Sequence, residues 1–220
     1  MENVLNTGVY ISLQKRIIFF HIPKTAGLAI TNAFENCIAR DHELNTWANL
    51  YYDVTKDPEG LNTRTGLKHL PYHVTQPSLK LFLNYIGQRV DNFFEFVVVR
   101  HPYERLLSLV KYSEILNKFN NSAVMSINSV LDAVEKDSNR FYQSQMKWID
   151  NPITKKLNVY KYEELLITGW QDIKTKLNLD LPNLQKINVS PLADLNLTKE
   201  QKMRCYQLFK REFMELGYEP

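Results

Sequence analysis

The strongest constraint on the fold is the run FFEFVVV at residues 93–99, which is nearly all apolar and β-branched toward its end. A strand that is buried on both faces has this composition, because parallel sheets are covered by helices on either side. The run continues directly into RHPYERLLSLVKYSEIL, in which Pro102 suits the first turn of a helix. The segment therefore predicts a buried strand, a short turn and a helix.

A second segment with the same organisation lies near the start of the chain. The apolar run RIIFFHI (16–22) leads through the turn PKTAG into LAITNAFENCIA (28–39), whose apolar residues recur at helical spacing. VYISL (9–13) and LNVYKY (157–162) predict further strands. Further helices are predicted at QPSLKLFLNYIG (76–87), INSVLDAVEK (127–136), YQSQMKWI (142–149), YEELLITGWQDIKTKLNL (162–179) and TKEQKMRCYQLFKREFMELG (198–217), the last with Thr198 as N-cap.

Apolar strands that alternate with helices predict an α/β fold with a central, mainly parallel sheet flanked by helices. The chain has 220 residues, of which 44% are hydrophobic, and no internal repeat, so we expect a single domain over residues 1–220. Ligands of such sheets bind at the carboxyl ends of the strands. The segments PKTAG and RHPYERLLS both follow strands, and we expect them to face one crevice.

The overall composition is compatible with a small anionic ligand. There are 27 Lys and Arg against 24 Asp and Glu, a net charge of +3, and no concentrated basic stripe that would favour nucleic acid. Cys37 and Cys205 match no metal-binding spacing, which favours reduced thiols. No leader pattern opens the chain and no apolar run approaches the length of a membrane span. We expect a soluble, cytoplasmic protein without a membrane segment or a nucleic-acid partner.

The turn PKTAG (23–27) has the features of an anion-binding loop. A tight turn that opens a helix exposes backbone N–H groups at the positive end of the helix dipole. Lys24 adds a positive charge, Thr25 adds a hydroxyl donor, and Gly27 lets a ligand approach the backbone closely. The lysine precedes the glycine, however, and no GxxxxGK[ST] pattern is present. A plain strand–helix connection with a surface lysine is the alternative for so short a motif.

The turn RHPYERLLS (100–108) adds a second cation. Arg100 follows a buried strand, where a charged side chain is costly unless it reaches the crevice or an anion. A guanidinium in that position can grip a phosphate with two hydrogen bonds, and Ser108 can return its hydroxyl to the same anion. The alternative is an arginine that caps a neighbouring carbonyl and a serine tolerated within a helix. We expect Arg105 to form ion pairs on the helix surface and leave it out of the site.

Together the two motifs separate two classes of nucleotide enzyme. A kinase-like phosphotransferase would carry the Walker pattern and an acidic residue near a strand end to help hold Mg²⁺. Here the strand ends in VVVR, which delivers a cation in that position. The sequence therefore predicts a site for a highly anionic nucleotide that needs no metal.

The segments IFFHIPKTAG and FEFVVVRHPYERLLSLVKYS resemble the 5′-phosphosulfate loop and the 3′-phosphate motif of sulfotransferases. The chain is similar to the carbohydrate branch, which contains uronyl 2-O-sulfotransferases and small bacterial enzymes. The resemblance continues in the family's order through GLKHLPYHV, QSQMKWI, NVYKYEELL and LPNLQKINVSP to the closing FKREFMELGYEP. It implies a P-loop-like sulfotransferase fold, 3′-phosphoadenosine 5′-phosphosulfate (PAPS) as sulfuryl donor without a metal, and a hydroxyl acceptor on a saccharide or glycoconjugate.

The resemblance also implies roles for the residues of the two motifs. Arg100 and Ser108 would hold the 3′-phosphate, and Lys24 would neutralise the charge that builds on the bridging oxygen during transfer. The residues implied to hold the 5′-phosphosulfate are Lys24, Thr25 and the backbone of Ala26, Gly27, Leu28 and Ala29. The later motifs contribute residues that we expect to be structural rather than catalytic, namely Gln145, Tyr160, Glu163 (a helix N-terminal acid) and Asn188 (a loop former).

The acceptor hydroxyl needs a general base, and histidine suits this role because its pKa is near neutral. His69, in GLKHLPYHV, matches the family's basic histidine, and His73 is the alternative. His21 and His101 flank the two motifs and are expected to orient loops or to lie in the core, and His42 has no informative context.

One departure from the family pattern concerns Leu28 and Ala29, which stand where sulfotransferases usually carry Thr or Ser. Each missing hydrogen bond to the 5′-phosphate would cost about 1.5–3 kcal/mol if nothing replaced it. A non-catalytic nucleotide- or polyanion-binding protein on the same fold is therefore the alternative. A working enzyme is favoured by the presence of Lys24, His69, Arg100 and Ser108.

Overall fold

The computed structural model describes residues 8–12, 15–38, 84, 87, 89–120, 124–137, 140–150, 152, 154–185 and 195–220. Its strands are β1 (Gly8–Ser12), β2 (Ile17–His21), β3 (Phe94–Val99) and β4 (Leu157–Lys161). The α-helices are α1 (Gly27–Ile38), α4 (Pro102–Asn120), α5 (Ile127–Glu135), α6 (Met146–Ile149), α7 (Tyr162–Glu164), α8 (Trp170–Leu177), α9 (Lys199–Leu208) and α10 (Lys210–Leu216). Short 3₁₀ turns η1 (Val90–Asn92) and η2 (Arg140–Tyr142) and a π-helical turn η3 (Leu165–Gly169) complete the described elements.

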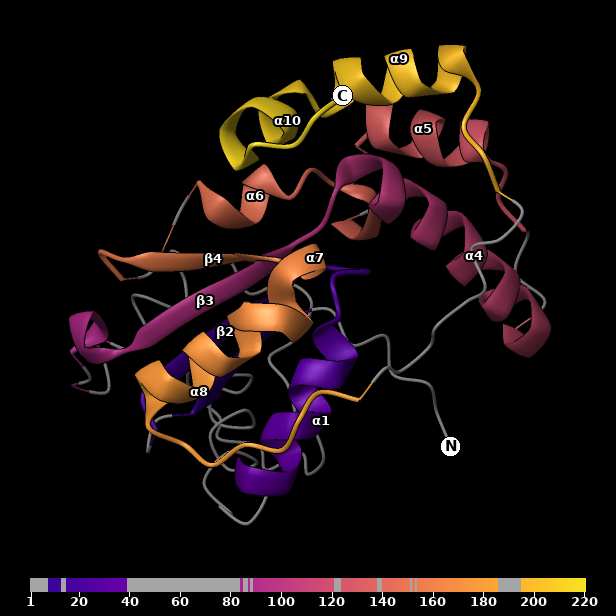
Figure 1. Ribbon diagram of the computed structural model, residues 1–220. Helices are drawn as coiled ribbons and strands as arrows, with labels where there is room; N and C mark the ends of the chain where they lie inside the picture. Colours follow the sequence, from indigo (N-terminus) through magenta and orange to yellow (C-terminus); the bar gives the residue numbers. More distant parts are fainter. Residues whose placement is uncertain are drawn as a thin grey trace, which may run out of the picture.

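The strands form one sheet in the order β1-β2-β3-β4, in which β1 is antiparallel to β2 and the other pairs are parallel. Helices lie on both sides of the sheet, with α1 and α8 below it in Figure 1 and α5, α6, α9 and α10 above it. The predicted α/β fold with a mainly parallel sheet is confirmed. The parallel pairs require crossover connections, which bring the helices onto the faces.

Alternate residues of the central strands enter two separate cores. Ile18, Phe20, Val97 and Val99 face α4, α5 and the carboxyl-terminal helices, where they join Leu106, Val130, Leu131, Cys205, Phe209 and Phe213. Ile17, Phe19, Phe96 and Val98 face α1 and α8, where they join Ile30, Phe34, Trp170 and Ile173. The residues Phe96–Val99 are completely buried, which confirms the prediction of a strand covered on both faces.

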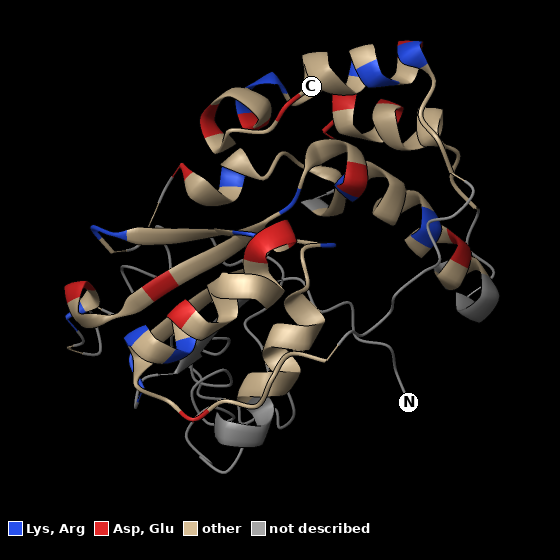
Figure 2. Ribbon diagram, viewed as in Figure 1, with Lys and Arg blue, Asp and Glu red and all other residues tan. Residues whose placement is uncertain are grey.

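The register of the parallel strands brings the two predicted loops to one edge of the sheet. Phe20 lies opposite Val97, so that the turn after β2 and the turn after β3 leave the sheet at the same level. Pro102 is the first residue of α4, as the sequence predicted. Figure 2 shows a basic position at the junction of β3 and α4, next to the acidic start of α7.

Three of the predicted helices are less regular or shorter than the sequence suggests. The stretch after β4 is helical throughout, but a π-helical turn separates α7 from α8. Thr198 is the N-cap of α9 and forms a capping box with Gln201, as predicted, while the helix breaks at Phe209 before α10 begins. YQSQMKWI forms only the short α6 after η2. The helix predicted at 76–87 lies almost wholly outside the described residues.

We expect Phe96 to be a main source of stability, because its ring is completely buried and contacts aromatic rings on either side. The ring centroids of Phe19 and Phe34 lie 4.8 and 6.1 Å away. Phe96→Ala should lower the free energy of unfolding by about 3–5 kcal/mol, because it leaves a cavity between the sheet and α1. Phe96→Leu keeps most of the volume and should cost less than about 1.5 kcal/mol. Denaturant titration followed by circular dichroism measures both, and equal losses would contradict the packing argument.

Candidate functional site

The turn between β2 and α1 has an unusual backbone. Lys24 and Ala26 have positive φ angles of 69° and 70°, a conformation that non-glycine residues adopt rarely and that is often found at functional sites. Thr25 lies between them with no exposed surface, and its hydroxyl donates to the Ile22 carbonyl at 2.9 Å. The helix begins at once, because the N–H of Ile30 donates to the Ala26 carbonyl at 3.2 Å. The N–H groups that precede Ile30 have no partner within the helix and form the floor of a candidate anion site.

A glycine is required at position 27 by the position of the His21 ring. A Cβ atom at this position would lie 1.8 Å from the Nε2 and Cδ2 atoms of the His21 ring, far closer than atoms can approach. His21 is buried and its ring stacks on Phe19 with the centroids 6.0 Å apart. His21 therefore lies in the core, which is one of the two roles predicted for it. The glycine lets the helix begin directly over the His21 ring.

The ammonium group of Lys24 is partly buried and lies near one other cation and one aromatic ring. Its Nζ atom is 4.2 Å from the centroid of the Tyr112 ring, which belongs to α4. Burial, and secondly the positive charge of Arg100, lower the pKa of Lys24 from 10.5 to about 8. A lysine held next to another cation in this way is stabilised by any anion that binds between them.

The side chain of Arg100 extends toward Lys24 from the end of β3. This side chain is mostly buried, with Nη1 donating to the Lys24 carbonyl at 3.4 Å and the guanidinium carbon 4.5 Å from the centroid of the Tyr162 ring. Glu104, one turn along α4, lies 3.7 Å from Nη2 and is half exposed. The Nε atom of Arg100 is buried and has no hydrogen-bond partner among the described residues. A donor of this kind fits an anionic oxygen.

The prediction that Arg105 forms ion pairs on the helix surface is wrong. The side chain is 1% exposed, and its Nε atom donates to the Pro23 carbonyl at 3.1 Å while Nη2 donates to the Phe141 carbonyl at 3.3 Å. Arg105 therefore ties α4 to the turn that carries Lys24. Helical spacing alone did not reveal this role, because the partner carbonyl lies 82 residues away in the chain.

The other predicted site residues lie partly within and partly outside the described residues. Ser108 is half-buried on α4, and Leu28 and Ala29 are half-buried in the first turn of α1. The N–H of His101 donates to Glu163 at 2.8 Å and its Nε2 atom lies 3.0 Å from the Glu219 carbonyl oxygen, so it orients loops as predicted. The predicted residues that lie outside the described residues are His42, His69, His73 and Asn188.

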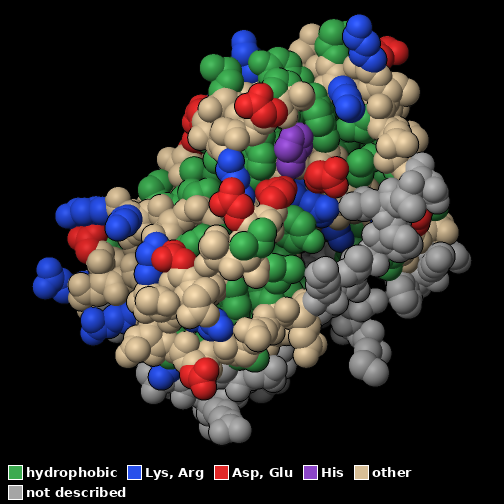
Figure 3. Space-filling model, in the orientation of Figure 1, with side chains coloured by type: hydrophobic (Ala, Val, Ile, Leu, Met, Phe, Trp, Pro, Cys, Tyr) green, Lys and Arg blue, Asp and Glu red, His purple; other side chains and the backbone are tan. Residues whose placement is uncertain are grey.

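Two aromatic residues of the site were not singled out from the sequence. Tyr112 and Tyr162 place their rings against the cationic groups of Lys24 and Arg100, respectively. Contacts between a cation and an aromatic face hold the charged group in place without neutralising it. Figure 3 shows basic and acidic side chains gathered beside a histidine on this face of the molecule, over α7 and the start of α4.

The geometry therefore joins two cations and a helix N-terminus at one edge of the sheet. Residues 8–168 of the chain match the Sulfotransferase family, a range that includes both cationic turns. The chain belongs to the Sulfotransferase family. No match to it was found among curated proteins or among solved structures.

Membership of the sulfotransferase family makes the chain a PAPS-dependent enzyme that transfers a sulfuryl group. The residues at the edge of the sheet fit this donor, because PAPS carries anionic groups at both ends and the edge presents Lys24, Arg100 and the unpartnered Nε donor. Among the described residues, no cluster of three or more His, Cys, Asp or Glu is placed to hold a metal ion. The expectation of metal-independent transfer stays a prediction.

The part of the chain that the structure describes contains no helix with the length and apolar character needed to cross a membrane.

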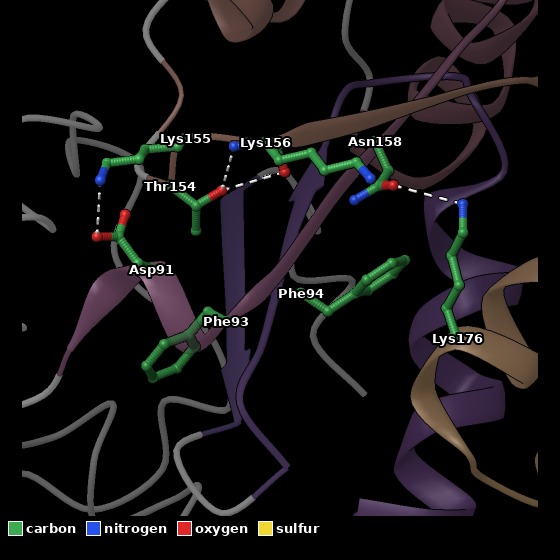
Figure 4. A pocket seen from close by; sticks show the side chains of 8 residues that line it. All are labelled: Asp91, Phe93, Phe94, Thr154, Lys155, Lys156, Asn158 and Lys176. Carbon is green, nitrogen blue, oxygen red and sulfur yellow. Dashed lines mark hydrogen bonds and ion pairs between the residues drawn. The ribbon is translucent and has the colours of Figure 1, made fainter.

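A cavity of about 430 Å³ lies at the opposite edge of the sheet, at the amino ends of β3 and β4 (Figure 4). Lys155, Lys156 and Lys176 line it, but Lys155 pairs with Asp91 at 3.5 Å and Lys176 pairs with Asp172 at 2.7 Å. Two of the three lysines at this cavity are therefore paired with carboxylates. Ligands of parallel sheets bind at the carboxyl ends of the strands, so this cavity is not the donor site.

The lowered pKa of Lys24 makes a prediction about the nucleotide product, adenosine 3′,5′-bisphosphate (PAP). Below pH 8 the side chain is protonated and attracts the anion, and above pH 8 it loses its proton in the free enzyme. The affinity for PAP should therefore fall as the pH rises through about 8. Isothermal titration calorimetry at pH values on both sides of this value measures the change.

Lys24→Arg is the matched control, because arginine keeps its proton over the whole range. The variant should bind PAP with no inflection near pH 8, whatever its absolute affinity. A wild-type affinity that is flat across this pH range would show that Lys24 does not meet the charge of the nucleotide.

Proposed function

We propose that the enzyme transfers the sulfuryl group of PAPS to a hydroxyl of a saccharide or glycoconjugate. Lys24 contacts the 5′-phosphosulfate, and Arg100 and Ser108 contact the 3′-phosphate. The observation that carries this assignment is the approach of Lys24 and Arg100 from two strand ends, with Arg100 close enough to lower the pKa of the lysine. Among the described residues, no carboxylate forms an ion pair with Lys24. The Glu104 carboxylate, which lies 3.7 Å from Arg100, is half exposed.

The chemistry proposed for these residues is an in-line displacement. The acceptor oxygen forms a bond to sulfur while the bond between sulfur and the bridging oxygen of PAPS breaks. The bridging oxygen leaves with the nucleotide and gains negative charge, which the Lys24 ammonium offsets. His69 takes the proton of the acceptor hydroxyl, with His73 as the alternative, and both histidines lie outside the described residues. The remaining work of the protein is positioning.

The first loop is proposed to hold the 5′-phosphosulfate mainly through its backbone. The hydroxyl of Thr25 donates to the Ile22 carbonyl, which leaves the backbone N–H of Thr25 as the group it would offer to the ligand. Leu28 and Ala29 have no side-chain donors, but helix geometry leaves their N–H groups without a partner in the helix. Several oriented N–H groups at a helix start favour an anion even without side-chain hydroxyls.

The acceptor class rests on the resemblance of GLKHLPYHV and the later motifs to the carbohydrate 2-O branch. A hydroxyl on a saccharide has a pKa far above neutral, so a general base is needed to remove its proton. The motif with His69 supplies one in that branch. The saccharide acceptor is therefore proposed on the basis of this resemblance.

The test of this function combines binding with transfer. PAP should raise the melting temperature of the enzyme without added Mg²⁺, and Arg100→Ala should remove most of this effect because the 3′-phosphate loses its partner. Transfer of labelled sulfate from PAPS should then be found with uronate-containing polysaccharides and not with simple phenols. Stabilisation by Mg-ATP but not by PAP would overturn the donor assignment. Transfer to phenols alone would overturn the acceptor assignment, and PAP binding without transfer to any acceptor would favour a binding protein.

The general base is tested by a comparison of His69→Ala with His73→Ala. We expect the His69 variant to lose about 10²–10⁴-fold in kcat, the usual contribution of a general base, while its affinity for PAP stays unchanged. The His73 variant should keep most of its turnover. If the two results are exchanged, His73 is the base, and if both variants turn over normally, the base lies elsewhere.

A further inference from the structure

The backbone of Arg100 is held by a side chain rather than by the sheet. The ladder between β3 and β4 ends at the pair Val99 and Lys161. One residue further on, the Oε1 atom of Gln145 accepts a hydrogen bond from the Arg100 N–H at 2.9 Å, and its Nε2 atom donates to the Arg100 carbonyl at 2.8 Å. The amide of Gln145 thus replaces the next residue of a neighbouring strand and fixes the peptide groups on both sides of Arg100.

Gln145 is in turn oriented by a carboxylate from α10. Oε1 of Glu212 accepts from the Gln145 backbone N–H at 2.7 Å, and Oε2 accepts from the Gln145 side-chain Nε2 at 2.6 Å. Because Nε2 donates to Glu212, the oxygen of the same amide must face the N–H of Arg100. Glu212 therefore selects the one orientation of the amide that matches both groups of Arg100.

Gln145 and Glu212, which are linked by these two hydrogen bonds, are both completely buried. Gln145 and Glu212 have no exposed surface, and the buried Arg105 lies close enough to Glu212 for their charges to interact. Buried charged groups often contribute less to the stability of a fold than well-packed apolar residues of similar volume would. What the carboxylate provides here is direction for the amide and, through it, for Arg100.

The residue after Arg100 is also held from the carboxyl-terminal end. His101 donates its N–H to Oε1 of Glu163, whose Oε2 accepts from the Tyr218 hydroxyl at 3.1 Å. The His101 ring contacts the Glu219 carbonyl, and Lys161 donates to the Gly217 carbonyl at 2.9 Å. Two consecutive residues of the turn are thus fixed by α10 and by the residues that follow it.

We propose that Glu212, acting through Gln145, is a positioning residue that holds Arg100 for the 3′-phosphate of the donor. Glu212 lies outside the residues 8–168 that match the family, so nothing in the match assigns it a role. The inference rests on the proposed role of Arg100. It assigns part of the donor affinity to α10, the helix that ends four residues before the last residue described.

The test uses Glu212→Gln, which keeps the shape of the side chain. Its amide can still accept from the Gln145 N–H through its oxygen, but its NH₂ group then faces the NH₂ of Gln145. The Gln145 amide must turn over or move away, and in either case Arg100 loses a matched partner. We expect the dissociation constant of PAP to rise about ten-fold or more, in the range for loss of a hydrogen bond to a charged group.

A second ligand separates positioning from simple loss of stability. Adenosine 5′-monophosphate (AMP) lacks the 3′-phosphate, so its affinity should change little in the Glu212→Gln variant. The measured quantity is the ratio of the dissociation constants of AMP and PAP, taken by calorimetry below the melting temperature of each variant. A purely structural role would lower the melting temperature and leave this ratio unchanged, which would overturn the proposal.

Two further variants complete the design. Glu215→Gln removes a carboxylate from the exposed face of the same helix, where it pairs with Arg211, and should leave the ratio unchanged. Arg100→Ala removes the 3′-phosphate contact itself and should lower the ratio strongly. If Arg100→Ala leaves the ratio unchanged, the proposed function of Arg100 has failed. If Arg100→Ala lowers the ratio and Glu212→Gln does not, only the positioning role of Glu212 has failed.

Discussion

The site depends on the approach of two positive side chains that repel each other. Lys24 and Arg100 arrive from the ends of neighbouring parallel strands, and the charge of the arginine adds to burial in lowering the pKa of the lysine. Such an arrangement costs free energy, which the rest of the structure must supply. An anion that binds between the two cations would offset this free energy. The anion would raise the pKa of Lys24 and accept a hydrogen bond from the buried Nε of Arg100.

Two hydrogen bonds fasten the two turns to each other in spite of this repulsion. Arg105 donates to the Pro23 carbonyl, and Arg100 donates to the Lys24 carbonyl. Hydrogen bonds that involve a charged group contribute about 1.5–3 kcal/mol each. Both use backbone carbonyls as acceptors, so these two contacts hold the turns together without a carboxylate, and the Glu104 carboxylate near Arg100 is half exposed.

The sequence predicted the parts of the fold that depend on local pattern. The strand at 94–99 and the N-cap at Thr198 follow from apolar runs and from capping chemistry, both of which are written in neighbouring residues. Both cationic turns were placed correctly at one edge of the sheet, because the ends of parallel strands meet there. The roles of Arg105, Gln145 and Glu212 were not predicted. Their partners lie tens of residues away, and a buried charge on a helix has the same sequence signature as a solvated one until the helix is packed.

The two cations of the site are not interchangeable, and the structure treats them differently. The pKa of a lysine falls readily when it is buried, and the pKa of Lys24 is lowered in this way beside Arg100. Arginine keeps its charge, and Arg100 is accordingly given fixed supports, with the Gln145 amide on its backbone and the Tyr162 ring against its guanidinium. A rigid arginine suits the role proposed for Arg100, which is only to hold the 3′-phosphate. A lysine whose pKa can change suits the role proposed for Lys24, beside the oxygen that gains charge as the sulfuryl group leaves.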